Sequence, residues 1–72
     1  MFEPDKFYTT AGLIDCVMKV DRIVTTDATD VVMKVIWYNR QLGGYPLAAE
    51  TVRIPLLKVD KWKVIDFLPN EE

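Results

Sequence analysis

Few side chains in this sequence could carry out catalysis. The 72-residue chain has no histidine and no serine, which removes the commonest general base and the serine nucleophile. Its one cysteine, Cys16, falls in an apolar strand pattern, where a thiol without an activating base behaves as a small buried hydrophobe. The carboxylates lie beside basic residues or on alternating polar faces, as solvated side chains do: Asp15, Asp21, Asp60 and Asp66. The sequence therefore predicts no catalytic residue and a protein that is not an enzyme.

A turn cluster at residues 25–30, TTDATD, is the best candidate for a metal site. Asp27 and Asp30 could help to hold a hard cation, but calcium loops need more closely spaced oxygens than this stretch supplies. Aspartate and threonine are also ordinary turn residues. Gly43 and Gly44 lack the lysine and the spacing of a phosphate-binding loop, and they predict a flexible turn. We therefore predict no metal, no cofactor and no identifiable small-molecule substrate.

Aromatic side chains are candidates for a ligand pocket: Phe7, Tyr8, Tyr38, Tyr45 and Trp62. Gathered at one end of a barrel, they would bind a proline-rich peptide, a methylated lysine or a stacked nucleic-acid base. The simpler interpretation places the tryptophans in the core and the tyrosines over it as half-exposed cover, because aromatic residues dominate small cores. Tyr8, Tyr45 and Trp62 remain the residues of a possible ligand pocket.

Strands must position these side chains, and the strongest strand signal is residues 31–39, VVMKVIWYN. Alternate residues of a strand face opposite sides of a sheet. The set expected to face a core is wholly apolar: Val31, Met33, Val35 and Trp37. The same alternation over residues 13–24 predicts a second strand with its own core-facing set: Ile14, Cys16, Met18 and Val20.

Three shorter strands are predicted at residues 6–9, 50–57 and 62–67. Pro55 cannot donate to a ladder, so it marks an edge, a bend or the end of its strand. Residues 58–61 predict a short turn or one turn of 3₁₀ helix, residues 39–49 a long connection, and residues 70–72 a solvated tail. This spacing predicts an all-β fold: a small, strongly bent antiparallel barrel of four or five strands, with residues 1–72 as one domain.

Charges suggest how the two long strands pair. One register places Asp21 opposite Lys34 and Asp15 opposite Arg40 on the outer face. The same register places apolar residues opposite each other on the inner face, Val20 with Val35 and Met18 with Trp37. Both faces then carry favourable cross-strand pairs.

Composition limits the classes of partner and the cellular compartment that the sequence is compatible with. Half of the residues are hydrophobic and the net charge is −2, which does not favour binding to nucleic acid or to anionic lipid. A single cysteine allows no intrachain disulfide, and the apolar runs are far shorter than a membrane span. With no signal-peptide pattern at the start, these features predict a cytoplasmic protein without a membrane partner.

The pattern resembles the SH3-like barrels, including the Tudor-type modules, in strand count and spacing. The resemblance rests on GLIDCVMKVDRI, DVVMKVIWYN and ETVRIPLLKVDKW, and it covers roughly residues 7–66. The Ala-Leu-Tyr-Asp-Tyr run and the Trp-Trp pair of peptide-binding SH3 domains are missing, so the resemblance implies an architecture and no ligand residues. In size and style the chain also resembles small accessory proteins of tailed phages, which would be made in the host cytoplasm.

The outer face of the predicted sheet carries more apolar surface than one small barrel should expose. Its main residues are Val17, Val32, Ile36 and Tyr38, joined by Leu13 and Ile23. Either a second layer from the same chain covers this face, or another protein does. We therefore predict a non-enzymatic module that acts through protein–protein contacts at these residues, as a homo-oligomer or as part of a larger assembly. The alternative function is a module whose aromatic pocket binds a peptide or a nucleic-acid base.

Overall fold

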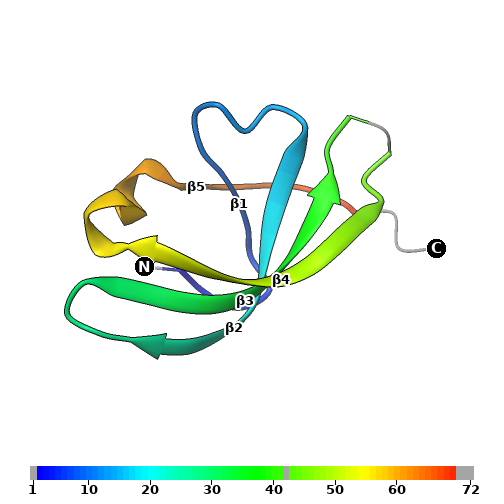
Figure 1. The fold of residues 1–72 in the computed structure, drawn as a ribbon. Helices are drawn as coiled ribbons and strands as arrows, with labels where there is room; N and C mark the ends of the chain where they lie inside the picture. The colour runs from blue at the N-terminus through cyan, green and yellow to red at the C-terminus, as the bar shows by residue number, and fades with distance from the viewer. Residues whose placement is uncertain (1, 42, 70–72) are drawn as a thin grey trace.

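The computed structural model describes residues 2–41 and 43–69; the predicted tail at residues 70–72 lies outside them. Within the described residues, five strands form one antiparallel sheet in the order β4-β3-β2-β1-β5 (Figure 1). The strands are β1 (Phe7–Thr9), β2 (Cys16–Thr26), β3 (Asp30–Asn39), β4 (Pro46–Pro55) and β5 (Lys63–Ile65). The all-β fold and the strand number are confirmed. The sheet does not close, because β4 and β5 are its two edges.

Strand boundaries differ from the prediction mainly around β4. This strand begins at Pro46, so the predicted connection at residues 39–49 is much shorter than expected. Pro46 and Pro55 are its first and last residues, positions where an edge strand tolerates proline. The predicted turn after it is a 3₁₀ helix, η1 (Leu56–Lys61), which leads into β5.

The predicted register between β2 and β3 is correct for the first half of β2. Met18 lies opposite Trp37, and Val20 lies opposite Val35. The register also holds one step beyond β2, where the backbone N–H of Arg40 donates to the carbonyl oxygen of Asp15 at 2.8 Å.

A β-bulge at Asp21 ends this register, so the predicted pair of Asp21 with Lys34 is wrong. Arg22 is the residue opposite Lys34, and Ile23 then lies opposite Met33. The bulge lets two consecutive charged residues face solvent and returns Ile23 to the core side, where it packs against the core. Ile23 is therefore not on the outer face as predicted. β2 and β3 both bend sharply in the middle, as an extra residue in one strand requires (Figure 1).

The core fills the inner face of the bent sheet. Its fully buried side chains are those that the alternation predicted in β2 and β3: Met18, Val20, Val31, Met33 and Val35. Phe2, Tyr8 and Ile54 complete the cluster, with Trp37 and Trp62 among the partly buried residues that pack against it.

Two residues predicted to face the core depart from it. Cys16 is only half-buried at the start of β2, and Ile14 is 69% exposed. Ile14 lies in the β1–β2 loop, where the N–H of Leu13 donates to the carbonyl oxygen of Thr10 at 3.0 Å and Gly12 adopts a φ of 91°. A left-handed glycine reverses the chain there, so the strand alternation does not reach Ile14.

Candidate functional site

The predicted interaction residues are mostly covered by the chain itself. Val17 is 0% exposed, Tyr38 2% and Val32 9%, whereas Ile36 is half-buried. Of the two alternatives left open by the sequence, a second layer from the same chain accounts for this burial. These four residues therefore do not form an exposed docking surface.

An aromatic cluster on the outer face forms this second layer around Tyr38. The ring of Phe67, which follows β5, lies 5.2 Å from the ring of Phe7 and 6.0 Å from that of Tyr38. Phe7 and Tyr38 are themselves 5.7 Å apart in an edge-to-face arrangement. The ammonium of Lys19 lies 5.9 Å from the centre of the Phe7 ring. Aromatic contacts of this kind stabilise beyond the area that they bury, and the cation adds to them.

The residues of the possible ligand pocket are not brought together. Tyr8 is 7% exposed and belongs to the core, where its ring lies 4.9 Å from Phe2 and its hydroxyl accepts a hydrogen bond of 2.9 Å from the N–H of Glu3. Trp62 packs on the same Phe2 ring at 6.2 Å. Tyr45 is 48% exposed in the β3–β4 loop. Trp62 thus packs on the core, as the simpler interpretation expects. Tyr8 is a core residue and not the half-exposed cover that this interpretation makes of the tyrosines.

The two carboxylates of the turn between β2 and β3 are engaged in contacts with the protein itself. Asp27 Oδ1 accepts hydrogen bonds from the N–H groups of Thr29 and Asp30 at 2.9 Å and 2.8 Å. The guanidinium of Arg53 on β4 lies 3.3 Å from Asp30 Oδ2. Within residues 2–41 and 43–69, no group of three or more acidic, cysteine or histidine side chains could hold a metal ion. The turn is a structural unit tied to β4.

Asp27 should make the stability of the protein depend on acid pH. Hydrogen bonds from the backbone of Thr29 and then Asp30 lower the pKa of Asp27 below its ordinary value of 3.8. A carboxyl group with a lowered folded pKa stabilises the fold above its unfolded pKa, and this contribution is lost as pH falls through the folded pKa. Asp27→Ala should therefore melt at a lower temperature than the wild type at pH 7, and the difference should vanish well below pH 3.8.

Thermal melts of the two proteins from neutral to acid pH measure this effect. Asp27→Asn is the matched control, because its side-chain oxygen can accept the same two hydrogen bonds without titrating. A gap between wild type and Asp27→Ala that stays constant down to pH 2 would contradict the role assigned to the carboxylate.

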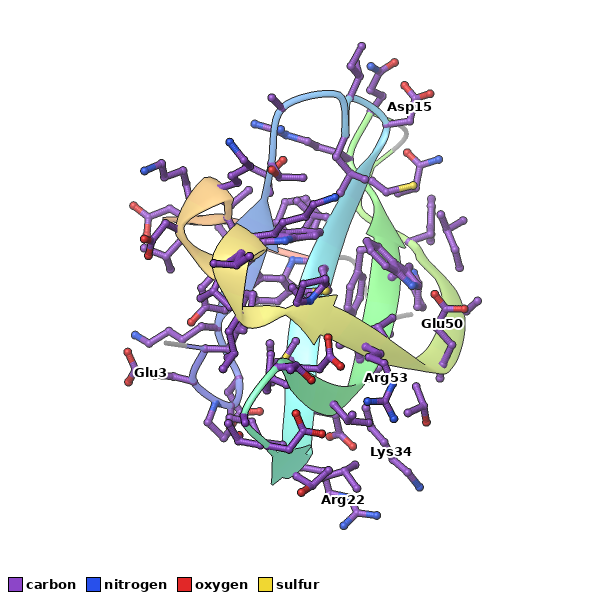
Figure 2. All side chains as sticks on the ribbon, turned by 60° about the vertical axis from the view of Figure 1, so that its left-hand side comes forward. Glu3, Asp15, Arg22, Lys34, Glu50 and Arg53 are labelled. Atoms are coloured by element: carbon purple, nitrogen blue, oxygen red, sulfur yellow. The ribbon has the colours of Figure 1, made fainter. Side chains whose placement is uncertain are left out.

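The free edge of β4 is one surface that the sequence prediction did not single out. In an antiparallel ladder, alternate residues exchange hydrogen bonds with the neighbour. The bond of 2.8 Å from the N–H of Leu56 to the carbonyl oxygen of Thr29 fixes this alternation just beyond β4. With this alternation, the residues of β4 that bond to β3 are every second one, and the N–H and C=O groups of Ala49, Thr51 and Arg53 point away from β3. β4 is exposed over most of its length, and Figure 2 shows Glu50 and Arg53 projecting from it.

The other surface is a basic hollow at the end of the sheet near the β1–β2 loop, with a volume of roughly 590 Å³. It is lined by Thr9, Thr10, Ala11, Leu13, Ile14, Arg40, Lys61 and Lys63. Its cations come from the residue after β3, the end of η1 and the start of β5, so no local sequence pattern joins them. A second, smaller hollow on β2, β3 and β4 carries both signs of charge, with Asp21 and Glu50 beside Lys34.

Comparisons with known proteins do not assign either surface. No protein-family model, no curated protein and no solved structure matches the chain. Within the described residues, no helix has the length and apolar character needed to cross a membrane. The β4 edge and the basic hollow are therefore candidate sites by their geometry alone.

Proposed function

We propose that this protein is a non-enzymatic β module that acts through protein–protein contacts and associates with a second copy of itself. The observation that carries the proposal is the free edge of β4, a ten-residue strand with backbone donors and acceptors turned outward. Its prolines stand at the two ends, and the stretch from Ala48 to Ile54 has neither proline nor lysine to discourage pairing. Addition of a strand to such an edge is a common mode of protein recognition.

A two-fold contact centred on Thr51 suits this edge best. Antiparallel pairing across a two-fold axis places Thr51 opposite its own copy and Ala49 opposite Arg53, all with outward-facing backbone groups. A threonine pair across a ladder is favourable. A shift of the centre to Glu50 would place two carboxylates directly opposite each other, which is unfavourable.

The non-enzymatic part of the proposal is supported by the chemistry of the chain. The sequence has no histidine or serine to act as base or nucleophile. The carboxylate of Asp27 is engaged by its own turn. Cys16 is a free thiol, which fits the proposed cytoplasmic location, whether in a cell or in the host of a phage.

The SH3-like architecture is part of the same proposal. It is supported by the antiparallel order of the strands and by the 3₁₀ helix η1 immediately before the last strand. A role as an accessory protein in a larger, phage-type assembly would use the same exposed edge, with the partner's strand in place of a second copy.

Light scattering over a range of concentrations tests self-association. The wild type should shift from monomer to dimer between about 10 µM and about 1 mM, the range of weak contacts. Thr51→Pro removes an outward N–H without removing a bond to β3, so it should stay monomeric and folded. Thr51→Ala keeps the N–H and should still dimerise. A wild type that stays monomeric at 1 mM, or a Thr51→Pro variant that still dimerises, would refute the edge contact.

Cysteine cross-linking tests the register. In a Cys16→Ala background, Thr51→Cys should form a disulfide-linked dimer on mild oxidation, because opposed residues of a hydrogen-bonded pair lie about 5.5 Å apart at Cα. Val52→Cys should cross-link poorly. The opposite result would move the two-fold axis to Val52.

A further inference from the structure

We propose that the basic hollow binds an acidic peptide segment that also carries apolar side chains. This site is separate from the β4 edge, and it does not depend on self-association. The charges, the fixed backbone and the apolar surface of the hollow all point to this ligand.

Positive charge is concentrated in the hollow. Arg40, Lys61 and Lys63 line it, and no carboxylate is among its lining residues within the described part of the chain. The chain as a whole has nine basic and eleven acidic residues, so the hollow has the opposite balance of charge. Asp15 is the nearest acidic residue along the β1–β2 loop, and Figure 2 shows it projecting outward from that loop. Its backbone oxygen, rather than its carboxylate, contacts the backbone of Arg40. The hollow therefore attracts an anion.

Hydrogen bonds hold the backbone segments that carry the cations. The hydroxyl of Thr10 donates to the carbonyl oxygen of Lys61 at 2.8 Å, which ties the β1–β2 loop to the end of η1. Lys63 lies opposite Thr9 in the β1–β5 ladder. The N–H of Arg40 is held by the carbonyl oxygen of Asp15. Segments distant in sequence thus form one wall, and little backbone ordering is needed on binding.

Apolar surface in the same hollow favours an acidic peptide over other anions as the ligand. Ile14 is 69% exposed here, and Leu13 and Ala11 lie beside it. An acidic peptide with aliphatic side chains would satisfy the cations and cover this surface. A nucleic acid fits less well, because no aromatic side chain among the described residues lines the hollow for base stacking and the net charge is −2.

Fluorescence anisotropy with a labelled hexapeptide, Glu-Leu-Asp-Leu-Glu-Leu, tests the proposal. Arg40→Glu, Lys61→Glu and Lys63→Glu should each weaken binding about three- to tenfold, because each replaces an attraction with a repulsion. Lys34→Glu makes the same change in charge on β3, outside the hollow, and it should change binding less than about twofold. Added salt should weaken binding to the wild type.

Amide chemical shifts of the wild type locate the site without any substitution. The peptide should perturb residues 9–14, 40 and 61–63 most strongly. Thr51→Pro should bind the peptide as the wild type does, so failure of the β4 proposal would leave this result unchanged. The proposal would be overturned if the protein did not bind the peptide at millimolar concentration, or if it bound Lys-Leu-Lys-Leu-Lys-Leu equally well or a thymidine oligonucleotide more tightly. Losses in Lys34→Glu or Thr51→Pro equal to those of the hollow variants would also overturn it.

Discussion

Met18→Ala is expected to lower the free energy of unfolding by about 2 to 5 kcal/mol, the usual cost of truncating a fully buried methionine. Met18 is 0% exposed and lies on the central strand β2, with Tyr8 opposite it on β1 and Trp37 opposite it on β3. The variant therefore leaves a cavity at the centre of the core. A chain of this length has a total stability of only roughly 4 to 10 kcal/mol, so the loss is a large fraction of it.

Urea unfolding followed by tryptophan fluorescence measures this loss. Ile14→Ala is the control, because the sequence placed Ile14 on the same face as Met18 and the structure leaves it 69% exposed. The control should change stability by less than about 0.5 kcal/mol. Equal effects of the two substitutions would mean that the alternation of the sequence, and not the observed burial, describes the core.

The inner core could be predicted from the sequence because a regular strand has a fixed period of two. That period placed Val31, Met33 and Val35 correctly, and they are 0%, 0% and 1% exposed. It failed at Asp21, where a bulge shifts the register and returns Ile23 to the core side. Two adjacent charges at Asp21 and Arg22 were the only local sign of this irregularity, and no cross-strand pairing rule predicts an inserted residue.

The surfaces could not be predicted because they join segments that are far apart in sequence. Arg40 and Lys63 line one hollow, and nothing in the spacing of the chain indicates that they share it. The alternation of the sequence predicts an apolar outer face, but nothing in the sequence identifies Phe67 as the residue that packs on Phe7 and Tyr38 there. The sequence offers Tyr8 and Tyr38 as candidates for one pocket, whereas the structure places them on opposite faces of the sheet. Tyr8 lies opposite Met18, and Tyr38 lies opposite Val17, the neighbour of Met18 on β2.

Removal of that cover should have the second largest effect on the fold. Phe67 is half-buried and packs on Phe7 and Tyr38 with ring distances of 5.2 Å and 6.0 Å. Phe67→Ala should lower the free energy of unfolding by about 1.5 to 3 kcal/mol, less than a fully buried phenylalanine would lose. It should also expose an apolar patch around Tyr38 and Val17, which are 2% and 0% exposed in the intact chain.

Urea unfolding measures the loss of stability, and the binding of an apolar fluorescent dye measures the newly exposed apolar surface. Leu68→Ala is the matched control. Leu68 follows Phe67 in the chain, but its side chain is 94% exposed and should contribute little to stability. The newly exposed patch should also drive association that no longer depends on β4, so Phe67→Ala combined with Thr51→Pro should self-associate where Thr51→Pro alone does not. If Phe67→Ala is as stable as Leu68→Ala and binds no more dye than it, the C-terminal segment does not cover the outer face in solution. The apolar residues of that face would then need a partner protein, which is the other alternative that the sequence allows.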